Sequence, residues 1–349
     1  MHQVIGCMSG TSLDGLDLAL CLFEETASGW KSTVKKASTF VYDDFWKNKL
    51  SNAHNLSAFD FSLLNIEFGR LIAEKILDFA CVEEFDLVAS HGHTVFHTPQ
   101  EHGLSVQIGD GSEISAILGK PIVYNFRQMD VSLGGNGAPL VPVGEKFLYP
   151  DFECFLNLGG IANISFHQKE RTLGFDVVPC NMVLNHFAQQ LGFSYDKDGI
   201  NARNGKFSQT LFDELNQLDF YALPFPKSLG REWVENVFEL IELKGAFLSV
   251  EDKMNTMCHH IAYQISNVLK NEKVKVMVTG GGAFNQFLFE LISTYSSENE
   301  YIKPEKLEIE FKEAKIFAFL GLLRVMNQEN VSKSITGAVK DSVSGVLVG

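Results

Sequence analysis

Apolar residues near the start of the chain fall in two runs that flank a short polar turn. Residues 3–8 are mostly apolar, residues 9–15 are small or polar, and residues 16–23 are again mostly apolar. This pattern predicts a β-hairpin. A similar unit occupies residues 152–166, with Gly159 and Gly160 in its turn. Two such hairpins, about half a chain apart, predict a duplicated domain.

The rest of the chain alternates between helical and strand-like patterns. Apolar residues at three- and four-residue spacing predict a helix over residues 59–81. Further predicted helices cover residues 112–118, 182–191, 208–215, 252–269, 284–295 and 313–326. Predicted strands cover residues 87–90, ending in a polar cluster at 91–94, and residues 122–124 and 274–279. Mixed strands and helices of this kind predict an α/β protein.

The length of the chain predicts two domains. Its 349 residues exceed the roughly 250–300 at which a single core stops growing. The Gly- and Pro-containing stretch at residues 134–142 is the expected break. We therefore expect one lobe over residues 1–135 and a second over residues 136–329. The final segment, about 330–349, is a candidate to return to the first lobe.

Composition and charge narrow the class of protein. The net charge of −14 argues against a nucleic-acid or anionic-membrane surface, since both require basic patches. The six cysteines form no Cys-x-x-Cys pair, which is typical of reduced thiols. Neither a signal-peptide pattern nor an apolar run of roughly 18 residues is present. We expect a cytoplasmic protein.

Glycine-rich turns are the main candidates for ligand binding. They lie at Gly10, at Gly159-Gly160 and at Gly280-Gly281-Gly282, each after an apolar strand. Polyphosphate binding needs backbone N–H groups directed at one point, and glycine allows this close approach. Each turn alone is also explained as a tight hairpin, but the three together favour phosphate. Asp14 and Asp17 are candidate Mg²⁺ ligands.

Other nucleotide and metal motifs match less well. No Walker A loop is present, and the Gly280 cluster lacks the dinucleotide spacing. His91, His93 and His97 form a histidine cluster, but no nearby Cys or carboxylate completes a metal site. A polar wall for a substrate, or a hydrogen-bonded loop, explains them better.

Several charged residues have a functional and a structural explanation. Asp176, at a strand end among apolar residues, is either a general base with a raised pKa or a solvated loop residue. Arg127 either binds a carboxylate or sugar oxygens of a ligand, or it forms an ion pair with Asp130 that holds a loop in place. Glu313 opens the last predicted helix, where a negative charge is favourable in any case. For Lys227, Arg231 and Glu232, a helix start and a ligand contact remain open.

With these residues in view, the chain resembles the anhydro-N-acetylmuramic acid kinases over nearly its whole length. The matching blocks are Met8-Ser9-Gly10-Thr11-Ser12-Leu13-Asp14-Gly15-Leu16-Asp17, Ser90-His91-Gly92, Gln107-Ile108-Gly109-Asp110, Phe126-Arg127 with Asp130, Gly137-Ala138-Pro139-Leu140-Val141-Pro142, Asn157-Leu158-Gly159-Gly160-Ile161-Ala162-Asn163, Tyr195-Asp196 with Asp198-Gly199, Pro226-Lys227-Ser228 with Gly230-Arg231-Glu232, Gly280-Gly281-Gly282 with Asn285, and Glu313-Ala314 with Ala318-Phe319.

The resemblance implies a two-lobed, actin-like ATPase (ribonuclease H-like) α/β fold, each lobe built on a five-stranded mixed sheet, with a nucleotide cleft between the lobes. It implies an enzyme that uses ATP and Mg²⁺ to open the 1,6-anhydro ring of the sugar and phosphorylate its 6-oxygen. The product is N-acetylmuramic acid 6-phosphate, formed in cell-wall recycling. The family also suggests a homodimer.

The resemblance also implies roles for individual residues. Asp176 matches the base that activates water, Glu313 faces the sugar, and Asp14 binds Mg²⁺. The expected sugar contacts are Arg127, His91 and Asn181. The expected ATP and phosphate contacts are Ser9, Gly10, Thr11, Ser12, Gly15, Gly159, Gly160, Gly280, Gly281 and Gly282.

Departures from the family pattern leave alternatives open. Residues 177–181, Val-Val-Pro-Cys-Asn, stand where the family has Thr-Gly-Pro-Gly-Asn, and His93 stands at the family's Gln. Asn125 and Asn136 are further changes near the expected sugar site. A kinase for another amino sugar and a non-catalytic ATP-binding regulator are therefore the alternatives.

Overall fold

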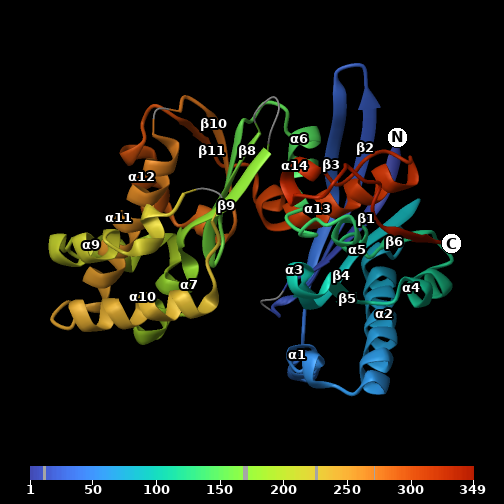
Figure 1. Cartoon of the computed structure of the whole chain (residues 1–349), viewed down its shortest axis with the longest axis horizontal. Coiled ribbons are helices and arrows are strands. Elements are labelled where there is room, and N and C mark those ends of the chain that lie inside the picture. Colours follow the sequence, from blue (N-terminus) through green and yellow to red (C-terminus); the bar gives the residue numbers. More distant parts are fainter. Residues whose placement is uncertain (11–12, 168–171, 225–226, 271) are drawn as a thin grey trace. The chain divides into compact units, whose positions relative to one another are not determined.

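The computed structural model describes residues 1–10, 13–167, 172–224, 227–270 and 272–349. The chain forms two compact units (Figure 1). Unit 1 comprises Met1–Pro150 and Phe311–Gly349, and unit 2 comprises Asp151–Glu310. The C-terminal segment thus belongs to the same unit as the N-terminus.

Unit 1 is built on a seven-stranded sheet with the order β12-β6-β4-β1-β2-β3, to which β5 is added beside β4. Strands β1, β2 and β3 are antiparallel, and β1, β4 and β6 are parallel. The bounds are β1 His2–Ser9, β2 Gly15–Thr26, β3 Gly29–Val41, β4 Leu87–Thr98, β5 Leu104–Ile108, β6 Ile122–Tyr124 and β12 Val346–Val348.

Helices cover both faces of this sheet. Successive residues of β1 point to opposite faces, so that Val4 joins the core under α13 and Ile5 joins the core under α2. The bounds are α1 Asp44–Ser51, α2 Ala58–Ala80, α3 Pro99–His102, α4 Gly111–Leu118, α5 Gln128–Ser132, α6 Val141–Leu148, α13 Lys306–Val325 and α14 Lys333–Thr336.

Helix α13 packs closely on the sheet. A β-carbon at Gly6 of β1 would overlap the carbonyl oxygen of Ala314, so only glycine allows this approach. The helix breaks at Phe311, where φ is −115° and ψ is 16°, and the boundary between the units falls there. Gly6 therefore allows the turn of α13 that carries Glu313 to lie close to β1.

Unit 2 repeats the strand arrangement of unit 1. Its five-stranded sheet has the order β11-β10-β7-β8-β9, with β7, β8 and β9 antiparallel and β7, β10 and β11 parallel. The bounds are β7 Cys154–Leu158, β8 Ile161–His167, β9 Thr172–Pro179, β10 Lys275–Thr279 and β11 Glu300–Ile302. The predicted duplication is confirmed. The expected five strands are common to both sheets, and β5 and β12 extend the first to seven.

Unit 2 has one core, to which its sheet and the long helix α11 contribute. The helices are α7 Asn181–Gln190, α8 Ile200–Asn204, α9 Gln209–Asn216, α10 Arg231–Lys244, α11 Val250–Leu269 and α12 Gln286–Tyr295. Short 3₁₀ turns are η1 Ala53–Asn55 in unit 1 and η2 Lys197–Gly199, η3 Asp219–Ala222 and η4 Gly281–Phe284 in unit 2.

Two predicted boundaries were wrong. The strand predicted to end at residue 90 continues as β4 to Thr98, because the residues from His93 onward pair with β5. The last long helix begins at Lys306, so Glu313 does not open it; Glu313 lies in the first turn after the break at Phe311.

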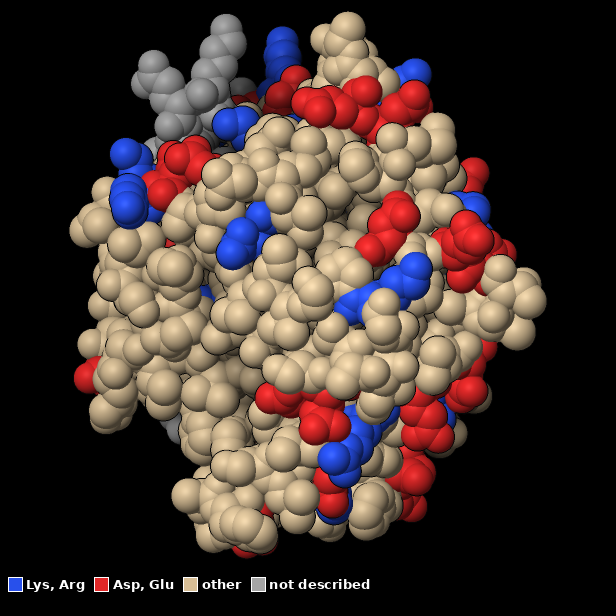
Figure 2. All heavy atoms as spheres, turned by 90° about the vertical axis from the view of Figure 1, so that its right-hand side faces the viewer, with Lys and Arg blue, Asp and Glu red and all other residues tan. Residues whose placement is uncertain are grey.

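The surface and the thiols match the composition. Figure 2 shows one face, on which Lys and Arg side chains are dispersed among Asp and Glu and form no continuous basic patch among the described residues. Of the six cysteines, none is in a disulfide, and only Cys81 is exposed. Within the described ranges, no helix combines the length and the apolar character needed to cross a membrane.

Candidate active site

The first glycine-rich turn connects β1 and β2 in unit 1. Ser9 ends β1, Gly10 follows, and the Leu13 N–H donates to the Gly10 carbonyl at 3.4 Å. Asp14 is exposed, and the adjoining Gly15 is buried at the start of β2. The predicted ligands Thr11 and Ser12 lie outside the described residues. The described part of the turn thus offers a backbone loop with one exposed carboxylate beside it.

Ser9 itself is buried and engaged by neighbouring side chains. Its Oγ accepts a hydrogen bond from the Tyr42 hydroxyl at 2.8 Å and lies 3.2 Å from His93 Nδ1. Its relative exposure is 1 %. The side chain therefore anchors the start of the turn in the interior of unit 1.

In unit 2, two glycine-rich turns meet at one edge of the sheet. Parallel strands β7 and β10 end together, with Asn157 opposite Thr279. The turn at Gly159 and Gly160 follows β7, and the turn at Gly280, Gly281 and Gly282 follows β10. Carboxyl ends of neighbouring parallel strands commonly form ligand sites in α/β proteins.

Asn181 joins these two turns. Its Nδ2 donates to the Leu158 carbonyl at 2.8 Å, and its side chain lies against Gly281 and Gly282. Its backbone N–H also donates to the Gly159 carbonyl at 3.1 Å. Asn181 therefore fixes the spacing between the two turns at the start of α7.

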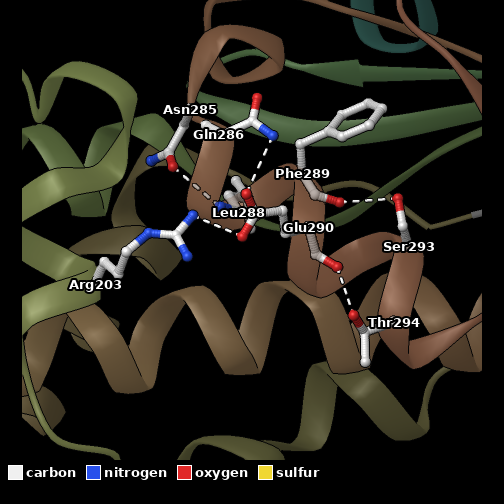
Figure 3. Close-up of polar contacts among 8 residues, drawn as sticks. All are labelled: Arg203, Asn285, Gln286, Leu288, Phe289, Glu290, Ser293 and Thr294. Carbon is white, nitrogen blue, oxygen red and sulfur yellow. Dashed lines mark hydrogen bonds and ion pairs between the residues drawn. The ribbon is translucent and has the colours of Figure 1, made fainter.

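The helix that follows the Gly280 turn is capped at its start and paired with α8 (Figure 3). Asn285 caps α12 by accepting from the Leu288 N–H at 3.0 Å. Arg203 of α8 pairs with Glu290 at 2.6 Å, and Gln286 donates to the same carboxylate at 3.2 Å. The Arg203–Glu290 pair therefore ties α12, which follows the Gly280 turn, to α8.

Asp176 lies on the edge strand β9 with one carboxylate oxygen engaged. Its Oδ2 accepts from the Leu229 N–H at 2.9 Å and from the Ser228 hydroxyl at 3.3 Å. Burial raises the pKa of Asp176, and these two hydrogen bonds oppose the shift. Within the described ranges Oδ1 has no hydrogen-bond partner, so a water molecule or a ligand group can occupy that side.

The segment that holds Asp176 is itself supported by Lys227. The Lys227 carbonyl accepts from the Asp176 N–H at 3.0 Å, and its ammonium donates to the Phe220 carbonyl at 2.9 Å. These contacts stabilise the local fold of unit 2, and they therefore favour a structural role for Lys227 over a ligand contact. The side chains of Arg231 and Glu232 lie outside the described set.

Arg127 lies at the centre of a polar cluster in unit 1. Its Nε donates to His91 Nε2 at 3.0 Å, and Nη1 donates to the Gly137 carbonyl at 2.7 Å. Burial lowers the pKa of Arg127 to about 10, opposed by the carboxylate of Glu313. Solvent reaches Glu313, yet the surrounding protein raises its pKa by desolvation, against the effect of Lys312 and Arg127.

Asp130 does not pair with Arg127 but holds the same loop. Its Oδ2 accepts from the Gly137 N–H at 2.8 Å, and its Oδ1 accepts from the Thr336 hydroxyl at 2.6 Å. Arg127 and Asp130 therefore both bind Gly137, one at the carbonyl and one at the N–H. The structural explanation holds for Asp130, while Arg127 retains Nη2 without a partner among the described residues.

His91 and His93 point to opposite faces of the sheet. The His91 ring lies 4.6 Å from Phe317 of α13, whereas the His93 ring lies 6.3 Å from Phe68 of α2. Residues two apart in a regular strand share a face, but the φ of +73° at Gly92 reverses the second ring. The two imidazoles therefore cannot share a metal ion.

Comparison with known proteins identifies the family. A sequence model described as anhydro-N-acetylmuramic acid kinase matches residues 2–349. The chain belongs to the anhydro-N-acetylmuramic acid kinase family. Relatives of that name come from Aliivibrio fischeri, 33% identical over 99% of both chains, and from Sulfurimonas denitrificans, 30% identical over 98% of both.

Solved structures give more distant matches. The activator of the 2-hydroxyisocaproyl-CoA dehydratase from Clostridium difficile, with bound ADPNP, has a TM-score of 0.46 at 12% identity, covering 91% of this chain and 94% of that one. The family membership and the duplicated sheet topology confirm the α/β, actin-like ATPase fold expected from the sequence.

The residues that depart from the kinase family pattern after Asp176 face the interior of unit 2. Val177, Val178 and Cys180 are at most 2 % exposed and belong to its hydrophobic core. Burial raises the pKa of the Cys180 thiol to about 12, so this group is an inert thiol at neutral pH. The change therefore alters core packing behind the strand rather than the chemistry of an exposed loop.

Three residues that hold candidate functional side chains within their own units were not predicted from the sequence. Tyr42 binds Ser9, Leu229 binds Asp176 through its N–H, and Thr336 binds Asp130. Each acts across a long sequence separation, and two of them belong to segments without a motif. Only the Lys227-Ser228-Leu229 segment carried a signal, since it adjoins a matching block.

Proposed function

We propose that this chain transfers the γ-phosphoryl group of ATP to the 6-oxygen of 1,6-anhydro-N-acetylmuramic acid while water opens the anhydro bridge. The product is N-acetylmuramic acid 6-phosphate, an intermediate of peptidoglycan recycling. The observation that carries this proposal is the match of the kinase family over residues 2–349.

Asp176 is the proposed base for the attacking water. A base must be ionised and must leave one oxygen free for the proton that it removes. Oδ2 is held by Leu229 and Ser228, so Oδ1 is the oxygen that receives this proton. The pKa of Asp176 is raised toward neutral pH, and a general base is most effective when its pKa lies near the working pH. As water attacks the anomeric carbon, the bridging oxygen leaves that carbon and takes the phosphoryl group.

Arg127 and Glu313 are the proposed contacts for the sugar. The Arg127 guanidinium is oriented by His91 and Gly137, which leaves Nη2 to bind a substrate oxygen or carboxylate. Because Nε2 of His91 already accepts from Arg127, we assign His91 to orienting the arginine. Because the Asn181 side chain likewise already donates to the Leu158 carbonyl, we assign Asn181 to holding the two glycine-rich turns of unit 2.

The glycine-rich turns are the proposed ATP contacts. The turn at Gly10 in unit 1 and the turn at Gly159-Gly160 in unit 2 would bind phosphate, and Gly280 to Gly282 would contact the nucleoside. Mg²⁺ would be held by Asp14, an exposed carboxylate of the kind that Mg²⁺ prefers. Asp17 is less available, because its Oδ1 accepts from Thr39 at 2.5 Å. The metal would neutralise charge on the transferred phosphoryl group.

Localisation and assembly follow from the family resemblance. We propose a cytoplasmic enzyme, with ATP and the amino sugar as its partners, that forms a homodimer. Light scattering on the purified protein tests the dimer: a single monomeric mass at micromolar concentration would exclude it.

Release of ADP from ATP and Mg²⁺, with and without the anhydro sugar, tests the central proposal. We expect strong stimulation by the sugar and the 6-phosphate as product. Parallel reactions with N-acetylmuramic acid and N-acetylglucosamine test for another amino sugar. Stimulation by one of these alone, or by none in a protein that binds ATP, would overturn the assignment. The inward orientation of Val177, Val178 and Cys180 favours the family substrate.

A further inference from the structure

A row of polar side chains crosses the sheet of unit 2 from the Gly280 turn to Asp176. Thr279 of β10 pairs with Asn157 of β7, and Asn157 pairs in turn with Asn163 of β8. Asn163 then pairs with Asp176 of β9. Residues that lie directly opposite each other in a sheet point to the same face. The four side chains, here called the polar row, therefore lie on one face of four successive strands.

The neighbours along each strand show which face this is. Leu156 and Leu158 flank the row on β7, and Ala162 and Ile164 flank it on β8; all four belong to the hydrophobic core of unit 2. The residues on either side of Asp176 belong to the same core. Because side chains alternate along a strand, the polar row lies on the face of the sheet that is turned away from this core.

The polar row has unused hydrogen-bonding groups. Among the residues that the structure describes, the side chains of Asn157 and Asn163 form no hydrogen bond, not even with each other, although they are paired. The buried hydroxyl of Thr279 also has no partner there. Polar groups that serve only the fold are generally hydrogen-bonded within it. The free amide of Asn163 and the free Oδ1 of Asp176 are thus available to the same water molecule or ligand.

An irregularity in the sheet brings Asn163 and Asp176 together. Ala162 pairs with Val178, yet the next residue, Asn163, pairs with Asp176, so β9 has one extra residue at this point. With regular pairing, Asp176 would lie opposite Ile164 and would face the core. Such bulges re-aim side chains and are frequent beside active sites. The bulge is therefore what places the proposed base next to an unpaired amide.

We propose that Asn163 is a second contact for the attacking water, beside the base Asp176. A water molecule that donates one proton to Asp176 Oδ1 and the other to the side-chain oxygen of Asn163 keeps a lone pair for the anomeric carbon. During the attack the first proton passes to Asp176, and the second stays on the new hydroxyl group. The bridging oxygen leaves the anomeric carbon with the bonding electrons and takes the phosphoryl group. This role rests on the proposed function, whereas the pairing of the two residues does not.

A crystal structure of the ligand-free protein tests the shared water without the sugar. We expect an ordered water within about 2.6–3.2 Å of both Asp176 Oδ1 and the side-chain oxygen of Asn163. In crystals of Asn163→Ala, this water should be lost or displaced. A water bound to Asp176 alone in the parent, or an Asn163 side chain turned to another protein group, would overturn the proposal.

Kinetics test what the water contact contributes. We expect Asn163→Ala to lower kcat for sugar-dependent ADP release about 10- to 100-fold, as for a misplaced reactant, and to leave KM for ATP within about threefold of the parent. The matched control is Ser165→Ala, on the same strand and the same face but opposite Gly174. It should turn over like the parent. An unchanged kcat in a folded Asn163→Ala would contradict the proposed contact.

A carboxylate at position 163 tests the juxtaposition in solution. Paired β-carbons are about 5 Å apart, so the two carboxylates of Asn163→Asp would resist ionising together. Burial and the bonds from Leu229 and Ser228 set the pKa of Asp176 in the parent. In Asn163→Asp, the upper of the two apparent pKa values should lie above it, measured by carbon NMR of labelled aspartates and assigned with Asp176→Asn.

The outcomes separate this proposal from the proposed function. An upper pKa no higher than that of Asp176 in the parent would overturn the placement of Asn163. If Asn163→Ala proves unfolded by circular dichroism, the parent crystal structure and Asn163→Asp carry the test. Failure of the parent to use the sugar would overturn the proposed function, while the crystal structure and the titration would still decide whether Asn163 and Asp176 share a water.

Discussion

Replacing Asp176 with asparagine tests the proposed base with little structural disturbance. The carbonyl oxygen of asparagine can accept both hydrogen bonds now made to Oδ2, from Leu229 and Ser228. Only the charge and the proton-accepting oxygen are lost. A positioned general base typically contributes 10²–10⁴-fold. We expect kcat for sugar-dependent ADP release to fall by about 100- to 10,000-fold, or about 2.7–5.4 kcal/mol in the barrier.

The same Asp176→Asn substitution should raise the stability of the folded protein although it lowers the activity. Burial raises the pKa of folded Asp176 above its ordinary value of 3.8, so the unfolded chain releases this proton at a lower pH than the folded chain. The ionised group therefore lowers the free energy of unfolding as the pH rises from its ordinary pKa through the folded pKa. Asp176→Asn should unfold at a higher temperature than the parent at neutral pH, and this difference should vanish in acid.

Asp176→Ala provides the contrast. It leaves the Leu229 N–H without its partner, which costs about 1–3 kcal/mol in a buried setting. We therefore expect both variants to lose most of their sugar-dependent activity, but only the alanine variant to be less stable than the parent. A coupled assay for ADP, with nucleotide binding as a control for folding, measures the first effect. Differential scanning calorimetry measures the second. Unchanged sugar-dependent turnover in a folded Asp176→Asn would refute the assignment of the base.

Four further predictions concern unit 1, the metal and pH. Gly6→Ala should lower the free energy of unfolding by about 1–3 kcal/mol or more, measured by urea unfolding, because the new methyl group overlaps the Ala314 carbonyl; Gly230→Ala, in open space at a φ of −86°, is the control. Arg127→Lys should raise KM for the sugar about 10- to 100-fold in steady-state kinetics, since lysine cannot keep both hydrogen bonds; an unchanged KM would exclude Arg127 from sugar binding. Chelation by EDTA should abolish ADP release and added Mg²⁺ should restore it; activity in EDTA would contradict the metal assignment. In the parent, kcat/KM should fall on the acid side through a pKa above 3.8, and this limb should be absent from the residual rate of Asp176→Asn.

Elements with a strong local pattern could be predicted from the sequence. The helix predicted over residues 59–81 is α2, and the strand predicted over residues 122–124 is β6. In α2, Ile76 and Phe79 of the predicting pattern enter the core, whereas Leu63 is 42 % exposed and its neighbour Leu64 is buried instead. Strand β3 was not predicted, since most of its residues are polar and it is stabilised by pairing with β2.

The candidate site was predictable only where chemistry and motif coincide in a short segment. The glycine-rich turns and Asp176 meet this condition. The bond between Tyr42 and Ser9 does not, because nothing in the sequence around residue 42 indicates a partner 33 positions earlier. The break of α13 at Phe311 was also missed, since the apolar spacing alone does not reveal a non-helical residue inside a helix.

Strand β4 explains how one segment serves two parts of the proposed reaction. Before Gly92, His91 faces α13 and orients Arg127, a proposed sugar contact. After Gly92, His93 faces α2 and holds Ser9, at the proposed phosphate turn. A regular strand would place both imidazoles on one face, and one of the two proposed contacts would lose its support. The positive φ of Gly92, which a β-carbon would also obstruct against the Ile108 carbonyl, is therefore a requirement of the site as well as of the fold.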